Sequence, residues 1–173
     1  MTTEKTNTQK LFSALDETWN EFFFLICCTD ENNINQIPFE DSWTVAQLAT
    51  HVKKSNNAIA QGLQMKGVPA NRSSDEREEE LRNTFLDFTI KFNSPDFIVP
   101  EKKEYQKRAV VEQLENSIEQ LKQLRQTTNL AQMINLPVFG EITKLELLYF
   151  VLYHTQRHLR QLKNILSILA QKN

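Results

Sequence analysis

Long stretches with apolar residues at steps of three and four constrain this chain more than any other feature. Such steps place the side chains on one face of an α-helix. In residues 8–28 the apolar positions are Leu11, Phe12, Leu15, Trp19, Phe22, Phe23 and Ile26. The 173 residues include only 3 glycines and 5 prolines, so the chain lacks the turn-forming residues that many short strands require. The sequence therefore predicts long amphipathic helices rather than a sandwich or a barrel.

Capping boxes mark the starts of three further helices. In this motif a Ser or Thr and a Glu or Gln three residues later each accept a hydrogen bond from the other's backbone N–H. The three pairs are Thr44 with Gln47, Ser73 with Glu76, and Thr143 with Glu146. We expect a helix after each pair, and the helix that opens at Ser73 carries Phe85, Phe88 and Phe92 on one face. The last helix runs to about residue 170.

The remaining segments complete one predicted domain over residues 1–173. Residues 105–126 show the same helical steps and form a fifth helix. Residues 93–104 contain two prolines and are expected to form an ordered loop, whose apolar residues 97–99 pack against the helices. Residues 127–142 connect helices, and no segment alternates as a strand would. The predicted fold class is all-α, a bundle around one core with an additional helix and an ordered loop.

Charge and hydropathy argue against two classes of partner. Lys and Arg number 20 and Asp and Glu number 22, and the formal charge of −2 provides no basic field for phosphates. The longest apolar run, residues 22–28, is far shorter than the roughly 20 residues that span a bilayer. The polar residues 1–10 lack the apolar core of a secretory signal. We expect a cytoplasmic protein that binds neither nucleic acid nor membrane.

Two of the chain's three histidines share one face of the last predicted helix. His154 and His158 are four residues apart, roughly 6 Å along the helix axis, so both rings can reach one divalent ion. Both interrupt an apolar surface, where an imidazole without a partner is energetically unfavourable. Either hydrogen bonds or a metal ion must satisfy these rings. The alternative is that they are ordinary core or surface histidines.

The third histidine, His51, lies on a different kind of helical surface. The other residues of its stripe are small or polar: Thr44, Gln47, Ser55, Ala58 and Gly62. Such a stripe allows another helix to approach closely, or it leaves a cavity. A ring that points into this space would complete a three-nitrogen site. Three neutral histidines suit Zn²⁺, Ni²⁺, Fe²⁺ or Cu²⁺ better than Mg²⁺ or Ca²⁺, and three protein ligands leave a position for water.

Two segments of the chain match known motifs in order and separation. Residues 43–51 read Trp-Thr-Val-Ala-Gln-Leu-Ala-Thr-His, and residues 154–162 read His-Thr-Gln-Arg-His-Leu-Arg-Gln-Leu. They resemble the second-helix motif and the closing motif of the DinB-like superfamily, also called the YfiT-like metal-dependent hydrolases. Phe139-Gly140 and residues 92–95 resemble one of its subgroups. The resemblance covers nearly the whole chain.

The resemblance implies a fold and a ligand set. The fold is a four-helix bundle with down-up-up-down connections, to which we add the extra helix and the ordered loop. The implied ligands of a divalent metal are His51, His154 and His158, and we expect Zn²⁺ or Ni²⁺. Relatives are often homodimers, and the broad apolar circumference of the last helix independently predicts a homodimer. Characterised relatives include transferases and isomerases that use bacillithiol or mycothiol.

Three functions stay open at the level of sequence. The first is a metal-dependent hydrolase that acts on a small molecule through a water bound to the three histidines. The second is a metal-dependent thiol transferase or isomerase of the bacillithiol type, and the third is a non-catalytic dimeric interaction bundle. No catalytic side chain is identified. Gln47 either orients His51 or the metal-bound water, or it is only the capping partner of Thr44. Arg157 either binds a substrate anion or is solvated or paired, and both Arg157 and Gln161 lie beside the ligand face.

Overall fold

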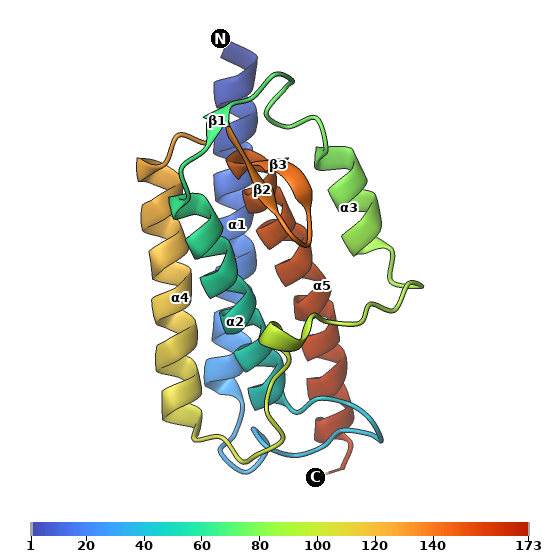
Figure 1. Cartoon of the computed structure of the whole chain (residues 1–173). Coiled ribbons are helices and arrows are strands. Elements are labelled where there is room, and N and C mark those ends of the chain that lie inside the picture. The colour runs from blue at the N-terminus through green and yellow to red at the C-terminus, as the bar shows by residue number, and fades with distance from the viewer. Residues whose placement is uncertain (1, 173) are drawn as a thin grey trace.

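Four long helices pack side by side in the computed structural model (Figure 1). The structure describes residues 2–172, with side chains from residue 7 onward, so Met1 and Asn173 at the ends of the predicted domain lie outside it. The helices are α1 (Thr2–Cys28), α2 (Val45–Gln64), α4 (Lys107–Thr127) and α5 (Lys144–Ala170). Helices α1 and α5 run one way and α2 and α4 the other, which is the down-up-up-down order. The predicted all-α four-helix bundle is confirmed.

Two of the three predicted capping boxes form. At the start of α2, the Thr44 hydroxyl accepts from the Gln47 N–H at 3.2 Å, and the Gln47 side chain accepts from the Thr44 N–H at 3.0 Å. Thr143 and Glu146 make the same two bonds at the start of α5, at 3.1 and 2.9 Å. Each box satisfies backbone donors that the start of a helix otherwise leaves without partners.

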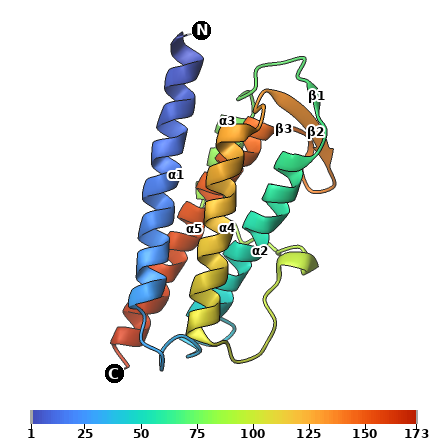
Figure 2. The ribbon, with the colours of Figure 1, turned by 90° about the vertical axis from the view of Figure 1, so that its left-hand side faces the viewer.

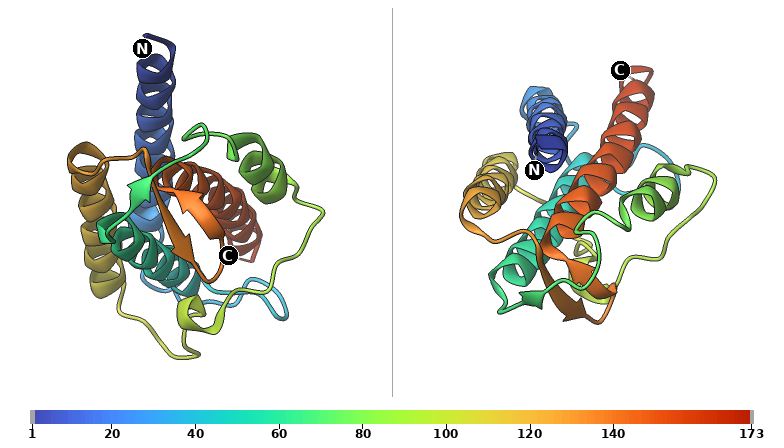
Figure 3. Two further views of the ribbon diagram at one scale, coloured as in Figure 1. Left: turned by 45° about the horizontal axis from the view of Figure 1, so that its top comes forward. Right: turned by 90° about the horizontal axis from the view of Figure 1, so that it is seen from above.

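The hydrophobic core lies between the helices, and α5 is its central element (Figures 2 and 3). The stripe predicted for residues 8–28 supplies Leu15, Trp19 and Phe22, which are fully buried, although α1 itself begins earlier, at Thr2. Helices α1, α2 and α3 all pack on α5. The apolar circumference from which we predicted a homodimer is therefore covered within the chain, and the homodimer stays a prediction. No helix among residues 2–172 is both long and apolar enough to cross a membrane.

The additional helix, α3 (Glu78–Leu86), lies outside the bundle against α5 (Figure 3). The prediction that it opens with a Ser73–Glu76 capping box is wrong. The Ser73 hydroxyl donates instead to the Asp75 carboxylate at 2.5 Å, and the residue before the helix is Arg77. The Arg77 N–H donates to Glu146 of α5 at 2.9 Å. A carboxylate from another helix thus takes the role that Glu76 was predicted to have.

The end of α3 also differs from the prediction, because it stops at Leu86 and leaves Phe88 and Phe92 in the following loop. Arg157 of α5 donates to the carbonyl oxygens of Phe85 and Asp87, at 3.1 and 2.9 Å. A cationic side chain at the last carbonyls of a helix stabilises its C-terminus. Both ends of α3 are therefore fixed by side chains of α5.

A small antiparallel sheet, absent from the sequence prediction, covers the end of the bundle where α5 begins (Figure 3). Its strands are β1 (Val68–Pro69), β2 (Gln132–Leu136) and β3 (Gly140–Thr143), in the order β1-β2-β3. Met133 pairs with Val68 on one side and with Thr143 on the other. Gly140, with φ +64°, closes the β2–β3 turn. Residues 127–142 connect α4 to α5 as predicted, but strands of two to five residues are too short to show alternation, so the sequence did not reveal the sheet.

The ordered loop predicted at 93–104 contains one turn of 3-10 helix, η1 (Asp96–Ile98), which packs on α2. Ile98 is buried as expected, but Phe97 is 60% exposed and Val99 is also exposed, so the prediction for residues 97–99 is only partly right. The Lys54 ammonium of α2 donates to the Val99 carbonyl at 2.8 Å. These contacts hold the loop across α2 beside α5 (Figure 1).

Candidate metal centre

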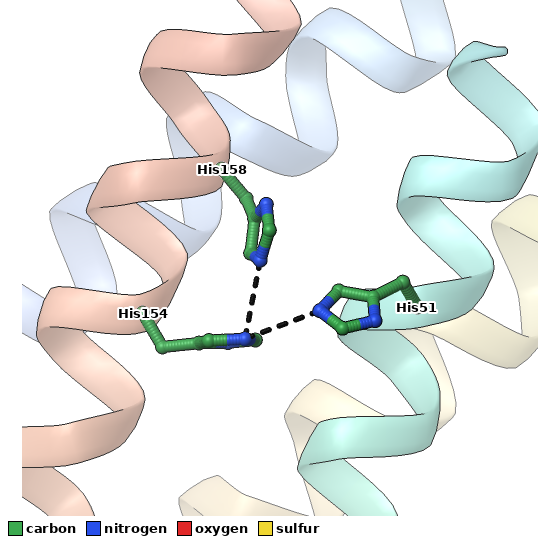
Figure 4. Close-up of side chains that lie close together, drawn as sticks. All are labelled: His51, His154 and His158. Atoms are coloured by element: carbon green, nitrogen blue, oxygen red, sulfur yellow. Dashed lines mark hydrogen bonds between the residues drawn. The ribbon is translucent and has the colours of Figure 1, made fainter. Parts of the chain in front are cut away.

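The three histidines converge on one point between α2 and α5 (Figure 4). The Nε2 atom of His154 lies 3.2 Å from Nε2 of His51 and 3.1 Å from Nε2 of His158. All three side chains are buried, and no more than 8% of any of these residues is exposed. The structure thus brings together the three residues that the sequence predicted as ligands. Among the described residues they are the one group of His, Cys, Asp or Glu that could hold a metal ion.

Hydrogen bonds at the Nδ1 atoms of two rings determine whether their Nε2 atoms carry a proton or a lone pair. His51 Nδ1 lies 3.0 Å from the Ile98 carbonyl oxygen, and His158 Nδ1 lies 2.9 Å from Gln161 Oε1. Both oxygens only accept, so each Nδ1 carries the proton and each neutral ring presents a lone pair at Nε2. His154 Nε2 faces both lone pairs, and it carries at most one proton. The cluster therefore cannot satisfy itself by hydrogen bonds alone.

A divalent ion fits this donor set. Zinc–nitrogen bonds of about 2.05 Å place two ligand nitrogens about 3.3 Å apart in a tetrahedron and about 2.9 Å apart in an octahedron. The two separations from His154, 3.1 and 3.2 Å, lie between these values, and the ligand atoms of all three residues lie within 4.8 Å of one another. Metal-ligating histidines commonly donate their other N–H to a carbonyl or a side-chain oxygen, as His51 and His158 do. The residues present can thus hold a divalent transition metal through three nitrogens.

Burial keeps the three rings in the neutral form that a metal requires. Desolvation, with a smaller effect of His51, lowers the pKa of His158 to about 3, although its hydrogen bond to Gln161 acts in the opposite direction. Desolvation, followed by the neighbouring His158 and His51, lowers the pKa of His154 well below 6.5. Desolvation also lowers the pKa of His51, although its hydrogen bond to Ile98 acts in the opposite direction. At neutral pH the rings therefore present lone pairs without first losing a proton.

Aromatic rings pack against the imidazoles. The Phe150 ring stacks on His154 with 5.0 Å between centroids, and the Trp43 ring lies 4.8 Å from that of His51. Phe150 was not among the predicted site residues, although it lies one helical turn before His154 and spacing alone could have identified it. The Ile98 carbonyl has no such signal, because it reaches His51 from a loop 47 residues away.

The triad opens into a cavity of about 780 Å³ between α2, α5, α3 and the loop. Ser55 and Ala58, from the small-residue stripe of His51, line it. Further along that stripe, a Cβ on Gly62 would lie only 3.2 Å from Leu147 of α5. The two alternatives for the stripe are therefore both realised, a cavity at one end and a close helix contact at the other. Seven of the 24 lining residues are Phe or Trp: Phe39, Trp43, Phe85, Phe92, Phe97, Phe139 and Phe150.

The three supporting residues have different positions. Gln161 contacts the triad directly, as the acceptor of the His158 Nδ1–H. The Gln47 side chain accepts from the Thr44 N–H in the capping box and donates to the Glu101 carbonyl at 3.3 Å, so its hydrogen bonds go to other residues than His51. Arg157 lines the cavity, but its guanidinium donates to backbone carbonyls of residues 85–90 and lies over the Phe92 ring. Arg157 is thus half-buried and paired with backbone carbonyls, as one of the two alternatives predicted, and it holds the cavity wall.

Comparison with known proteins agrees with the resemblance seen in the sequence. The pattern of the DinB superfamily matches residues 14–162. Uncharacterized protein YuaE of Bacillus subtilis (strain 168) is 28% identical over 158 residues, which cover 86% of this chain and 90% of YuaE.

Two solved structures are similar in fold. The crystal structure of TT2238, a four-helix bundle protein, has a TM-score of 0.60 at 18% identity and covers 91% of this chain and 98% of TT2238. YfiT from Bacillus subtilis, described as a probable metal-dependent hydrolase with an unusual four-helix bundle topology, has a TM-score of 0.58 at 16% identity. That match covers 93% of this chain and 86% of YfiT. At these identities the two structures show the fold alone.

Proposed function

This chain belongs to the DinB superfamily, and we propose that it is a divalent-metal-dependent hydrolase of a small molecule. One observation carries the proposal: three buried Nε2 atoms meet at one wall of a cavity, and two of them are fixed as lone-pair donors. The proposed ligands are His51, His154 and His158, with Zn²⁺ or Ni²⁺ as the ion. Three protein ligands are typical of catalytic sites, because they leave a position for water or substrate. YfiT, described as a probable metal-dependent hydrolase, has the same fold.

In this proposal the chain's own residues bind the ion and orient the ligand rings. A divalent ion in such a site lowers the pKa of bound water towards about 7 and polarises a carbonyl oxygen. Gln161 and the Ile98 carbonyl hold two of the ligand rings in the orientation and tautomer that the ion needs. Asp41 is the only carboxylate on the lining described, and it is exposed, so no buried carboxylate is available as a general base.

Metal content tests the site first. Protein reconstituted with Zn²⁺ or Ni²⁺ should hold about one ion per chain by elemental analysis, and His154→Ala and His158→Ala should each lose it. Gln156→Ala, between the two ligands on α5, is the matched control and should keep the ion. Equal metal retention in all four proteins would refute the site.

Activity assays then test the reaction class. Metal-loaded protein should hydrolyse members of a panel of small esters, amides and lactones, and a chelator should abolish this turnover. A parallel assay offers a bacillithiol-type thiol with an electrophile. Activity in that assay alone would replace hydrolysis by thiol transfer at the same metal. Inertness in both assays, with one bound ion, would favour the non-catalytic interaction bundle.

A further inference from the structure

Exposed aromatic rings gather around the cavity that contains the triad. Phe39, Phe92 and Phe97 line it and are 48, 43 and 60% exposed. Val138, also on the lining, is exposed as well. Exposed apolar side chains that cluster around a concave site mark a place where an apolar partner or ligand is bound. These side chains and the three histidines line the same cavity. A ligand that contacts the exposed apolar side chains can therefore also reach the triad.

The charges on the cavity lining are either exposed or already bonded. Asp41 and Lys91 are exposed, so water can solvate them. Arg157, the third charged residue, is occupied by three backbone carbonyls. A charged group among the aromatic rings would lose hydration, and an ion pair with the exposed Asp41 or Lys91 would return little of that free energy, because water screens it. The lining thus disfavours a charged body on the bound molecule.

The apolar wall is held in place by the same elements that hold the triad. Arg157 bonds the Ile90 carbonyl on one side of residues 91–97, and His51 and Lys54 bond the Ile98 and Val99 carbonyls on the other. A wall fixed before binding loses less conformational freedom when a ligand arrives. A ligand head at the triad and a ligand body on the wall can therefore be held together.

We propose that the substrate is a neutral molecule with two parts: a polar group that reaches the metal at the triad, and an apolar, aromatic body that lies against Phe92 and Phe97. Phe97 is the proposed specificity-determining residue, because most of its ring is exposed. This inference rests on the proposed function, since it requires a metal at the triad.

Three hydroxamates with one metal-binding head and different bodies test the proposal: acetohydroxamate, benzohydroxamate and 4-carboxybenzohydroxamate. Their dissociation constants are measured on Zn²⁺-loaded protein by calorimetry. A phenyl ring in place of the methyl group adds about 100 Å² of apolar surface, so benzohydroxamate should bind about 50-fold tighter than acetohydroxamate. The carboxylated analogue should bind about 10-fold more weakly than benzohydroxamate.

Two variants locate the body of the ligand. Phe97→Ala should weaken benzohydroxamate about fivefold and leave acetohydroxamate unchanged. Phe24→Ala is the matched control, because Phe24 is 63% exposed on α1 and is not on the cavity lining. It should change neither constant, and both variants should fold because both rings are mostly exposed.

The outcomes separate the two proposals. Binding of all three hydroxamates within about threefold of one another, or tightest binding of the carboxylated one, would overturn the substrate class and leave the metal centre standing. Equal effects of Phe97→Ala and Phe24→Ala would overturn the role of Phe97. If no hydroxamate binds the Zn²⁺-loaded protein, the proposed function fails, and the inference fails with it.

Discussion

The carboxylate of Glu146 is fully buried, and removal of its cationic partner should be strongly destabilising. Arg72 donates to both oxygens of Glu146, at 2.5 and 2.8 Å, and the N–H groups of Arg77 and Thr143 donate to the same carboxylate at 2.9 Å each. In Arg72→Met the charge stays buried with only the two N–H donors. Loss of one partner of a buried pair costs about 3–5 kcal/mol, and the remaining donors favour the low end, about 3 kcal/mol.

Urea unfolding followed by circular dichroism at pH 7 measures this difference, and it gives free energies of unfolding where the two-state test holds. Arg82→Met is the matched control. Its ion pair with Glu79 is 3.9 Å long, and the two side chains are 48 and 76% exposed. The loss of a surface pair of this kind costs about 0–1 kcal/mol. If Arg72→Met is no more destabilising than Arg82→Met, the argument from burial is wrong.

The pH dependence of the free energy of unfolding provides a second test of this prediction. Burial by itself raises the pKa of Glu146, but the hydrogen bonds from Arg72 and the two backbone N–H groups outweigh it, so the pKa is lowered. In the wild type the contribution of this carboxylate is fully present above the unfolded value of about 4.3 and is lost as pH falls through the lowered pKa.

Without Arg72, only the two backbone N–H groups counteract the effect of burial, so the pKa of Glu146 should rise. The folded variant then takes up a proton at a higher pH than the unfolded chain, so the variant regains stability as pH falls. The gap of about 3 kcal/mol between wild type and Arg72→Met should therefore narrow from pH 7 towards pH 4. A gap that is constant or widens over this range would show that the lost contact is not electrostatic.

Three further predictions concern the site, the sheet and the assembly. Gln161→Leu should weaken Zn²⁺ binding about 10- to 100-fold in a chelator competition, because the His158 Nδ1–H loses its acceptor. Gln126→Leu on α4 is the control, and equal Zn²⁺ affinities of the two variants would refute the role of Gln161 in holding His158. Gly67→Ala should lower the free energy of unfolding by about 1–3 kcal/mol, because a Cβ there would lie 2.8 Å from Gln132 and 2.9 Å from the Met133 carbonyl oxygen. Gly140→Asn should cost less, since no atom lies within 4 Å of a Cβ at Gly140 and Asn tolerates its positive φ. Urea unfolding that gives the reverse order would contradict this prediction. Light scattering should return about twice the chain mass of 20.2 kDa if the predicted homodimer forms, and a mass near 20.2 kDa at all micromolar concentrations would rule it out.

The sequence by itself determined the long helices and part of the site. Apolar steps and capping boxes act between residues three or four positions apart, so α2 and α5 begin where Thr44 and Thr143 predict. Spacings of three and four residues likewise put His154 and His158 on one face of α5, with Gln161 beside them. These relations depend only on helix geometry, which is the same in any fold.

The arrival of His51 at the same point is a tertiary result. The sequence showed a stripe of small residues and a family resemblance, but the position of α2 against α5 depends on packing along both helices. His51 and His154 are 103 residues apart, and their 3.2 Å separation follows from that packing. The Ile98 carbonyl that fixes the His51 tautomer comes from a loop whose position no local pattern specifies.

Only the tertiary structure decided the limits of α3 and the existence of the sheet. The predicted capping box at Ser73 does not form; instead Glu146, 69 residues away in the sequence, accepts from the Arg77 N–H at the start of α3. Arg157 donates to the carbonyls at the end of α3 and thereby sets where the helix stops. The strands form because separate segments meet and pair their backbones, as Met133 does with Val68 and Thr143. A short segment gains little from its own propensity, so donors and acceptors from distant elements determine where it begins, where it ends and which structure it adopts.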